Sequence, residues 1–393
     1  MYELLVNNAR VYTLADGVSG PGRTLAVNAG KIAALDCPQD APTKERLDAG
    51  GKLLLPGFVD CHTHALYAGD RMAEHVLKMR GASYADIAKA GGGILSTVKA
   101  VRAASESQLI EETLPRLEAL RAEGVTTVEI KSGYGLDLES ELKMLRAIRA
   151  LPRYIPMEIS ATFIGAHAVP AGLSREEYMR QVLDEMLPAV AAEKLADCVD
   201  IFVEHIGFQV GDLDRLAERA AQLGLKLRAH TDQLSNMGAT RRAAELGALS
   251  CDHLEYMDEA DAAAMGTYGT VAVLLPAAFY FLKETRKPPV ELLRRHKVPM
   301  AVATDLNPGS APVASLLTAM HMAGLLFGLT PDEVLAGVTR HAAQAMGLEG
   351  RIGALAPGLD ADFCLWDLPA PAFFNYQLGG LKPAQRFFKG RRT

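Results

Sequence analysis

The chain has 393 residues, of which 49% are hydrophobic and 22% are charged, and 41 basic against 47 acidic residues give a formal net charge of −6. Its length exceeds the roughly 250–300 residues at which a single core stops growing, so we expect two structural units or one large barrel with an appended domain. The modest negative charge gives no reason to expect nucleic acid or an anionic membrane as a partner.

The cysteines and the apolar runs indicate the compartment. Five cysteines lie far apart and form no Cys-x-x-Cys pair, which is typical of free thiols in a reducing compartment. The first residues lack the basic stretch and the continuous apolar block of a signal peptide, and the longest apolar run, VAVLLPAAFYFL, is too short to span a bilayer. We therefore expect a cytoplasmic protein with no membrane partner.

The two ends of the chain share one pattern. Short runs of alternating apolar and polar residues, separated by Gly, Pro and Asp, fill residues 1–54 and return in residues 346–393. Such runs are typical of antiparallel strands joined by turns. The pattern predicts that both termini combine into one small β-sandwich domain and that residues 55–345 form the second unit.

The middle of the chain alternates eight short β-rich runs with amphipathic helical stretches. Each helical stretch, ESELKMLRAIRAL for example, is long enough for one crossover helix, and polar residues cluster just past the strand ends. This succession predicts an α/β fold in which a parallel sheet closes as a (β/α)8 TIM barrel, with the chemistry at the C-terminal ends of the strands. The predicted strands lie in LLLPGFVDCHTH, VTTVEIKSG, PMEISATFIGAH, CVDIFVEH, LKLRAHTDQ, ALSCDHLEY, TVAVLLP and VPMAVATDLNPG.

Four side chains at these strand ends form a potential metal site. His62 and His64 stand one residue apart after the first predicted strand, and side chains two apart on a strand point to the same face. His230 follows the fifth predicted strand and Asp305 follows the eighth. Taken alone, a His-x-His pair is as often structural as it is metal-binding. Three imidazoles and one carboxylate together suit a zinc or iron ion.

The sequence around these residues resembles the amidohydrolase superfamily, and within it the cyclic amidohydrolases of histidine breakdown. The resemblance covers nearly the whole chain and is carried by PGFVDCHTHALYAGDR, GASYADIAKAGGGILSTV, KSGYGLD, GAHAVP, AHTDQLSN, DHLEYMDE, AVLLPAAFYFL and ATDLNPGS. It implies metal-dependent hydrolysis of the ring amide C–N bond of 4-imidazolone-5-propanoate to N-formimidoyl-L-glutamate. It also implies a homodimer, and one divalent or trivalent ion, zinc or iron, bound by His62, His64, His230 and Asp305.

The number of metal ions can be argued from the fourth predicted strand. Some related barrels hold two ions bridged by a carboxylated lysine on that strand, but CVDIFVEH contains no lysine, which favours one ion. Glu204, in the same segment, stays open as a second ligand. Lys131 lies on the second predicted strand, where we expect a structural or loop-contacting role.

Within the resemblance, Asp305, His253 and Gln233 are the expected catalytic residues. A carboxylate that touches both the ion and the nucleophile can accept the proton of water and pass it to the departing ring nitrogen, which is the role implied for Asp305. His253 would polarise the carbonyl or steady the nucleophile, although alone it could equally be a buried structural histidine. Deaminases of the superfamily, and some members of this group, carry a glutamate at the position of Gln233. Glutamine cannot shuttle protons, so Gln233 argues against deamination and is free to hydrogen-bond the substrate.

The propionate tail of the implied substrate requires local positive charge. Arg71 suits this task because a guanidinium can bind a carboxylate through two parallel hydrogen bonds. The substrate contacts that the resemblance adds are Tyr84, Tyr134, His167, Gln233, Asn307 and Gly309. Apart from substrate binding, the two tyrosines could be packing aromatics, the histidine could be a loop residue, and Asn307 and Gly309 could simply form the turn in the segment NPG.

Two rival functions share this barrel. Another cyclic amidohydrolase or a deaminase would keep the same ligands, whereas a catalytically silent barrel used for assembly would have lost part of the set. The intact ligand set argues against the silent barrel. Gln233 together with Arg71 and Tyr134 favours the imidazolone ring as the substrate over the substrates of a deaminase.

Overall fold

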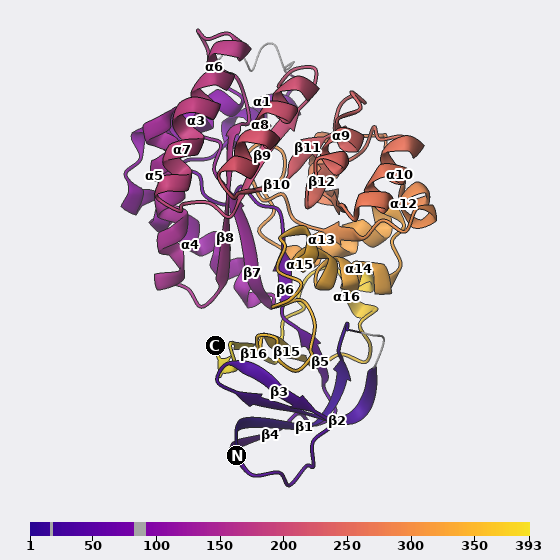
Figure 1. The fold of residues 1–393 in the computed structure, drawn as a ribbon. Coiled ribbons are helices and arrows are strands. Elements are labelled where there is room, and N and C mark those ends of the chain that lie inside the picture. Colours follow the sequence, from indigo (N-terminus) through magenta and orange to yellow (C-terminus); the bar gives the residue numbers. More distant parts are fainter. Residues whose placement is uncertain (16–18, 82–91) are drawn as a thin grey trace.

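The computed structural model describes residues 1–15, 19–81 and 92–393. Figure 1 shows a barrel ringed by helices and a smaller sheet below it, with both termini at the smaller sheet. This arrangement matches the two-part organisation expected from the sequence. Tyr84, one of the predicted substrate contacts, lies outside the described residues.

The barrel is a parallel sheet whose main strands follow one another in chain order. They are β6 (Phe58–Asp60), β7 (Val125–Lys131), β8 (Glu158–Ala166), β9 (Cys198–Val203), β11 (Ala229–Thr231), β12 (Ser250–His253), β13 (Val271–Leu274) and β14 (Met300–Val302). The short strand β10 (Lys226–Leu227) also pairs with β9. A parallel bridge between Thr63 and Leu306 joins the segment after β6 to the segment after β14. The predicted TIM barrel is therefore confirmed.

Helices cover the outside of the barrel (Figure 1). The helix α5 (Leu138–Ala150) illustrates how the sequence fixes them. The side chain of Asp137 accepts a hydrogen bond from the backbone nitrogen of Ser140 at 2.8 Å, which caps the helix, and the apolar stripe of Leu142, Leu145 and Ile148 is buried. Among the described residues, none of the helices combines the length and apolar character needed to cross a bilayer.

The remaining helices occupy the connections between the strands. Between β6 and β7 lie α1 (Met72–Met79), α3 (Ile94–Ala103) and α4 (Glu106–Ala122). The others are the 3-10 turn Leu151–Arg153, α6 (Arg175–Gln181), the π-helical turn Val182–Met186, α7 (Leu187–Ala192), α8 (Val210–Gln222), α9 (Ala239–Glu245), α10 (Glu259–Tyr268), α11 (Pro276–Leu282), α12 (Val290–Arg295), α13 (Leu316–Met322), the π-helical turn Ala323–Phe327, α14 (Pro331–Gly337), α15 (Arg340–Ala345) and α16 (Phe373–Tyr376).

The smaller sheet is built from both ends of the chain. Its strands are β1 (Tyr2–Tyr12), β2 (Ser19–Asn28), β3 (Lys31–Leu35), β4 (Thr43–Asp48), β5 (Leu53–Pro56), β15 (Phe363–Trp366), β16 (Gln385–Phe388) and β17 (Arg391–Arg392). The hydrogen-bonded order is β17-β16-β15-β5-β1-β2-β3, and β4 pairs with β1. Strand β5 pairs antiparallel with β15, which joins the N-terminal and C-terminal strands into one sheet as predicted.

The run LLLPGFVDC does not form a single strand, and this part of the prediction was wrong. It contains β5, which belongs to the smaller sheet, and β6, which begins the barrel. Gly57 lies between them, where a Cβ would come within 2.2 Å of Thr126 Oγ1, so only glycine fits at this crossing. The predicted domain limits of 1–54, 55–345 and 346–393 stay a prediction, and the first limit falls inside β5.

Aromatic side chains join the smaller sheet to the N-terminal end of the barrel. Phe58 stacks on Trp366 with ring centroids 5.4 Å apart and meets Phe374 edge-on at 5.3 Å. Trp366 and Phe374 are themselves 4.8 Å apart in an edge-on arrangement. We call these three side chains the aromatic floor. It fixes the start of β6, four residues before His62, against the smaller sheet.

Candidate functional site

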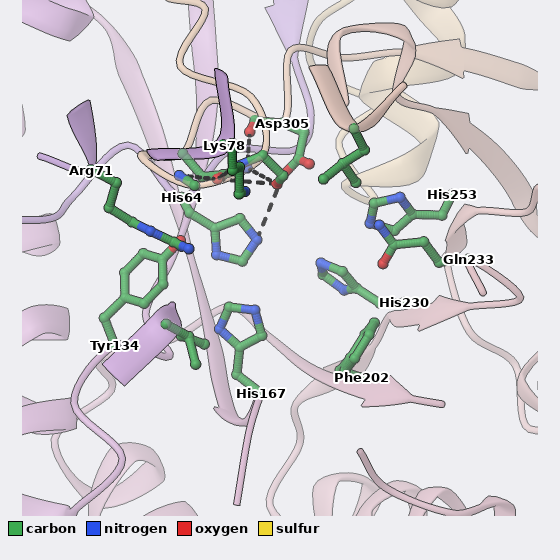
Figure 2. Close-up of a pocket in the computed structure, with 15 residues that line it drawn as sticks. His64, Arg71, Lys78, Tyr134, His167, Phe202, His230, Gln233, His253 and Asp305 are labelled. Carbon is green, nitrogen blue, oxygen red and sulfur yellow. Dashed lines mark hydrogen bonds and ion pairs between the residues drawn. The ribbon is translucent and has the colours of Figure 1, made fainter. Parts of the chain in front are cut away.

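The four predicted metal ligands converge at the C-terminal end of the barrel. One ring nitrogen each of His62, His64 and His230 lies within 4.8 Å of the others. Asp305 Oδ1 lies 3.5 Å from His62 Nε2 and 3.8 Å from His64 Nε2. All four side chains belong to residues that are at most 3% exposed. Figure 2 shows His64, His230 and Asp305 turned toward one shared space.

Several nitrogens at this convergence need a partner. His62 Nε2, His64 Nδ1 and His230 Nε2 are buried and have no hydrogen-bond partner among the described residues. Buried polar atoms are nearly always bonded, and a cation at the centre of the cluster would satisfy the Nε2 atoms of His62 and His230. Burial lowers the pKa of His62 and of His64 well below the usual 6.5, which keeps both rings in the neutral form that binds metals. The donor set therefore fits a transition-metal ion.

Two carboxylates hold the imidazole rings from behind. Asp252 Oδ2 lies 2.6 Å from His62 Nδ1, and Asp200 Oδ1 lies 3.0 Å from His230 Nδ1. With Nδ1 of each ring engaged, Nε2 is left to point at the common centre. Neither carboxylate was predicted from the sequence. The available signal was an aspartate inside each of the apolar strands CVDIFV and SCDH, where a charged residue is rare unless it is paired.

Asp305 and His253 stand beside this centre on left-handed backbone. Their φ angles are +53° and +85°, a region that residues with a side chain seldom adopt outside functional sites. Burial raises the pKa of Asp305 to about 7, so this carboxyl can exchange a proton near neutral pH. Burial also lowers the pKa of His253 well below 6.5, which keeps that ring neutral. The centroid of His253 lies 5.4 Å from that of His230.

A cavity of about 250 Å³ opens onto the centre and has room for a small molecule rather than a polymer. His167 and Tyr134 form part of its wall next to His64 (Figure 2). The ring of His167 stacks on that of His64, with centroids 4.9 Å apart and planes 14° apart. The predicted residues that line the cavity are His64, Arg71, Tyr134, His167, His230, Gln233, His253, Asp305, Asn307 and Gly309.

Arg71 and Gly309 lie against each other at the rim of the cavity. A Cβ at Gly309 would come within 2.1 Å of Arg71 Nη1, so the absence of a side chain there makes room for the guanidinium. Arg71 Nε and Nη2 donate to the carboxylate of Glu74 at 2.8 to 3.0 Å. The side chain of Asn307 bonds within its own turn, accepting from the backbone nitrogen of Gly309 at 2.8 Å. Asn307 therefore shapes the turn and also borders the cavity.

The cavity has further wall residues that were not predicted from the sequence. Lys78, Phe202 and Ser310 are among them. Lys78 lies in the last turn of α1, seven residues beyond Arg71. Positions seven apart share one face of a helix, so this spacing was the signal that could have identified Lys78.

Glu204 does not lie in the ligand cluster. Its oxygens accept hydrogen bonds from the backbone nitrogens of Leu234 and Ser235, at 2.8 and 3.2 Å, and from Ser235 Oγ at 2.6 Å. These bonds secure the loop that follows Gln233 and hold that residue at the cavity wall. The geometry gives Glu204 a part in shaping this loop, and its role as a second ligand stays a prediction.

The barrel, the added sheet and the histidine-aspartate cluster define an enzyme of the amidohydrolase type. A family model described as "Amidohydrolase family" matches residues 53–393. A 5-methylcytosine deaminase from Klebsiella pneumoniae is 18% identical with a TM-score of 0.74, the match covering 99% of this chain and 96% of that one. A zinc-bound adenosine deaminase from Xanthomonas campestris is also 18% identical, with a TM-score of 0.73 and coverage of 100% and 92%. At such identities these two structures show the common fold alone.

Curated relatives are much closer in sequence. The imidazolonepropionase of Hahella chejuensis is 52% identical over 98% of both chains, and that of a Bradyrhizobium species is 50% identical over 99% of both. The imidazolonepropionase of Vibrio campbellii is 46% identical over 99% of this chain and 98% of its own. The chain belongs to the amidohydrolase family and, within it, to the imidazolonepropionases.

Proposed function

We propose that this chain hydrolyses the ring amide C–N bond of 4-imidazolone-5-propanoate and releases N-formimidoyl-L-glutamate. The observation that carries the proposal is the meeting of three imidazoles and Asp305 at a small cavity whose rim holds Arg71. The cluster of imidazoles and carboxylate suits attack on an amide, and the guanidinium of Arg71 suits binding of an anionic tail. The relatives named imidazolonepropionase, at 46 to 52% identity, support the same assignment.

We assign His62, His64, His230 and Asp305 as the ligands of a single zinc or iron ion. When bound, such an ion lowers the pKa of a water molecule and polarises an amide carbonyl. The partnerless ring nitrogens described above support this ligand set. The hydrogen bonds of Glu204 to its neighbouring loop favour one ion over two.

The chain itself supplies the proton transfers. Asp305, with its pKa raised to about 7 by burial in the metal-free protein, accepts a proton from the attacking water through a carboxylate oxygen. The same oxygen then delivers that proton to the departing ring nitrogen. His253 stays neutral and offers a ring nitrogen as a hydrogen-bond partner to the carbonyl, while the side-chain amide of Gln233 bonds the ring edge.

The opposite side of the cavity binds the propionate. Arg71 Nη1 borders the cavity beside Gly309, and it is the donor that we assign to the substrate carboxylate. Because Glu74 already neutralises the charge of Arg71, Lys78 supplies the net positive charge at the rim. The hydroxyl of Tyr134 stays protonated, since burial raises its pKa, and so remains a hydrogen-bond donor. His167 completes this wall.

The oligomeric state and the cellular compartment of the protein are also proposals. The expected homodimer rests on the resemblance noted in the sequence. A cytoplasmic location is supported by the cysteines, since all five are free and four of them are buried. The domain limits stay as predicted from the sequence.

One experiment tests the proposed activity. Purified protein is incubated with 4-imidazolone-5-propanoate, loss of the ring absorbance is followed with and without a chelator, and metal content is measured by elemental analysis. We expect turnover with about one zinc or iron per chain, loss of turnover after chelation, and recovery when the metal is restored. A preparation that holds metal but leaves the ring intact would exclude this substrate. Release of ammonia would instead indicate deamination.

A further inference from the structure

A buried ammonium group lies next to the carboxylates that hold the ligand rings. Lys131, the last residue of β7, is fully buried, and its Nζ lies 2.8 Å from Glu129 Oε1 and 2.8 Å from Asp200 Oδ2. The same nitrogen lies 3.8 Å from Asp252 Oδ2. The three carboxylates come from three different strands, β7, β9 and β12. One lysine therefore joins three strands of the barrel just below the proposed metal.

Each of the three carboxylates also contacts the segment or ring that carries a ligand. Asp252 holds His62 Nδ1 at 2.6 Å, and Asp200 holds His230 Nδ1 at 3.0 Å. Glu129 Oε2 accepts a hydrogen bond from the backbone nitrogen of Thr63 at 3.2 Å. Thr63 separates His62 from His64 in the chain.

The backbone of Lys131 reaches the same segment. Its nitrogen donates to the carbonyl oxygen of Thr63 at 2.9 Å. The hydroxyl of Thr63 donates to the carbonyl oxygen of Glu129 at 2.7 Å. The His-x-His segment is thus bound to the end of β7 through both backbone and side chains.

Three carboxylates buried together repel one another unless cations lie between them. Arg228 is a second cation in this layer, 3.2 Å from Asp252 Oδ2 and 3.2 Å from Glu129 Oε1, but no ion pair links it to Asp200 within the described residues. Lys131 is therefore the cation that connects the support of His230 with the support of His62. The two cations offset part of the repulsion among the three carboxylates.

We propose that Lys131 is a positioning residue that fixes the relative placement of the metal ligands through Asp200, Asp252 and Glu129. The inference rests on the proposed metal site and names the residue that holds its ligands in register. It gives Lys131 a task beyond the structural or loop-contacting role expected from the sequence.

The test uses Co²⁺ as a probe in the full chain, in which the wild type and Lys131→Met are compared. Visible absorption of the bound Co²⁺ reports ligand geometry, and the rate of its transfer to a chelator reports how firmly the ligands hold it. We expect an altered Co²⁺ spectrum and about 10- to 100-fold faster transfer in Lys131→Met, the range usual for loss of groups that orient metal ligands.

Lys143→Met is the matched control. Lys143 Nζ donates to the carbonyl oxygens of Val101, Arg102 and Ala104 at 2.8 to 3.0 Å, so this variant also loses the bonds of a half-buried lysine, away from the ligands. It should lose thermal stability but keep the wild-type Co²⁺ spectrum and transfer rate. If Lys131→Met behaves like Lys143→Met in both Co²⁺ measurements, the inference is overturned while the proposed metal site stands.

Two further outcomes are decisive. A wild-type chain that takes up no Co²⁺ overturns the metal site itself, and with it this inference. Should Lys131→Met fail to fold, Glu129→Gln takes its place, because it keeps the side-chain volume while weakening the bond to Lys131. That variant should transfer Co²⁺ several-fold faster than the wild type, and an unchanged rate would refute the positioning role.

Discussion

The two ends of the barrel differ in what burial does for them. At the N-terminal end, the aromatic floor of Phe58, Trp366 and Phe374 packs apolar rings against one another. At the C-terminal end, His62 is buried with a partnerless ring nitrogen, and burial shifts the pKa values of both His62 and Asp305. Burial of apolar rings stabilises a fold, whereas burial of polar atoms without partners costs free energy. Phe58, at the start of β6, belongs to the aromatic floor, and His62, four residues further along the chain, belongs to the ligand cluster.

This contrast shows how the enzyme separates stability from chemistry. The floor stabilises the barrel without touching the cavity, so the upper end can keep features that destabilise it. Those features include left-handed backbone at His253 and Asp305. Substitutions at the two ends should therefore have opposite signatures in activity and in stability.

Asp305→Ala should have the largest effect on activity. The substitution removes a metal ligand and the proposed proton carrier at once, so kcat should fall on the order of 10³-fold or more. The free energy of unfolding of the metal-free protein should not fall, because a buried carboxyl is removed. Turnover assays, metal analysis and urea unfolding test, in that order, the loss of activity, the loss of the metal ligand and the unchanged stability. An intact rate would refute the role assigned to Asp305.

Trp366→Ala should show the reverse signature. Truncating this fully buried ring in the floor should lower the free energy of unfolding by about 3–5 kcal/mol, while kcat/KM per folded molecule stays near the wild-type value. Trp366 is the single tryptophan of the chain, so unfolding of the variant is followed by circular dichroism. Trp366→Phe is the milder control and should lose less. A fall in kcat/KM of the folded variant would show that the two ends are not independent.

Arg71→Ala should impair binding rather than chemistry. Loss of a charge-assisted bond to the propionate should raise KM about 10- to 100-fold and leave kcat within a few-fold.

Lys78→Ala should raise KM only about 3-fold, and less at high salt, because an exposed charge is screened. Lys99→Ala, an exposed lysine on α3 outside the cavity, is the control and should change neither constant. Steady-state kinetics at two ionic strengths measures the KM of each variant and shows whether Arg71→Ala raises it more than Lys78→Ala.

Metal affinity should depend on pH in a direction set by Asp305. Burial raises the pKa of this carboxyl to about 7 in the metal-free protein, and only the ionised form binds a cation. Below that pH a proton competes with the metal, so the apparent affinity should fall about tenfold per pH unit as the pH drops further. Competition with a coloured chelator between about pH 8 and pH 6 measures this. A flat profile would contradict the assigned pKa.

The sequence was sufficient for the elements that follow from local pattern. Alternating runs and crossover helices predicted the barrel, and barrel geometry then placed His62, His64, His230 and Asp305 at one end. The resemblance supplied the substrate, which spacing alone could not name. The sequence did not predict that the chain passes from the smaller sheet to the barrel at Gly57, because an apolar run has the same pattern whether its residues belong to one sheet or to two.

The support beneath the ligands was beyond local pattern. Lys131, Asp200 and Asp252 come from three strands, and their contacts depend on how those strands align in the closed sheet. No spacing along the chain encodes such a register. Lys78, in contrast, could have been predicted, because it lies seven residues beyond Arg71 in a helical segment.

The pairing of β5 with β15 has a consequence for how a newly made chain matures. Strand β5 runs through Gly57 directly into β6 and the His-x-His segment, but its antiparallel partner at residues 363–366 leaves the ribosome more than three hundred positions later. Until then β5 has only its parallel pairing with β1 within the smaller sheet. The fourth ligand, Asp305, is itself made late, so we expect the ion to be loaded only after most of the chain has left the ribosome.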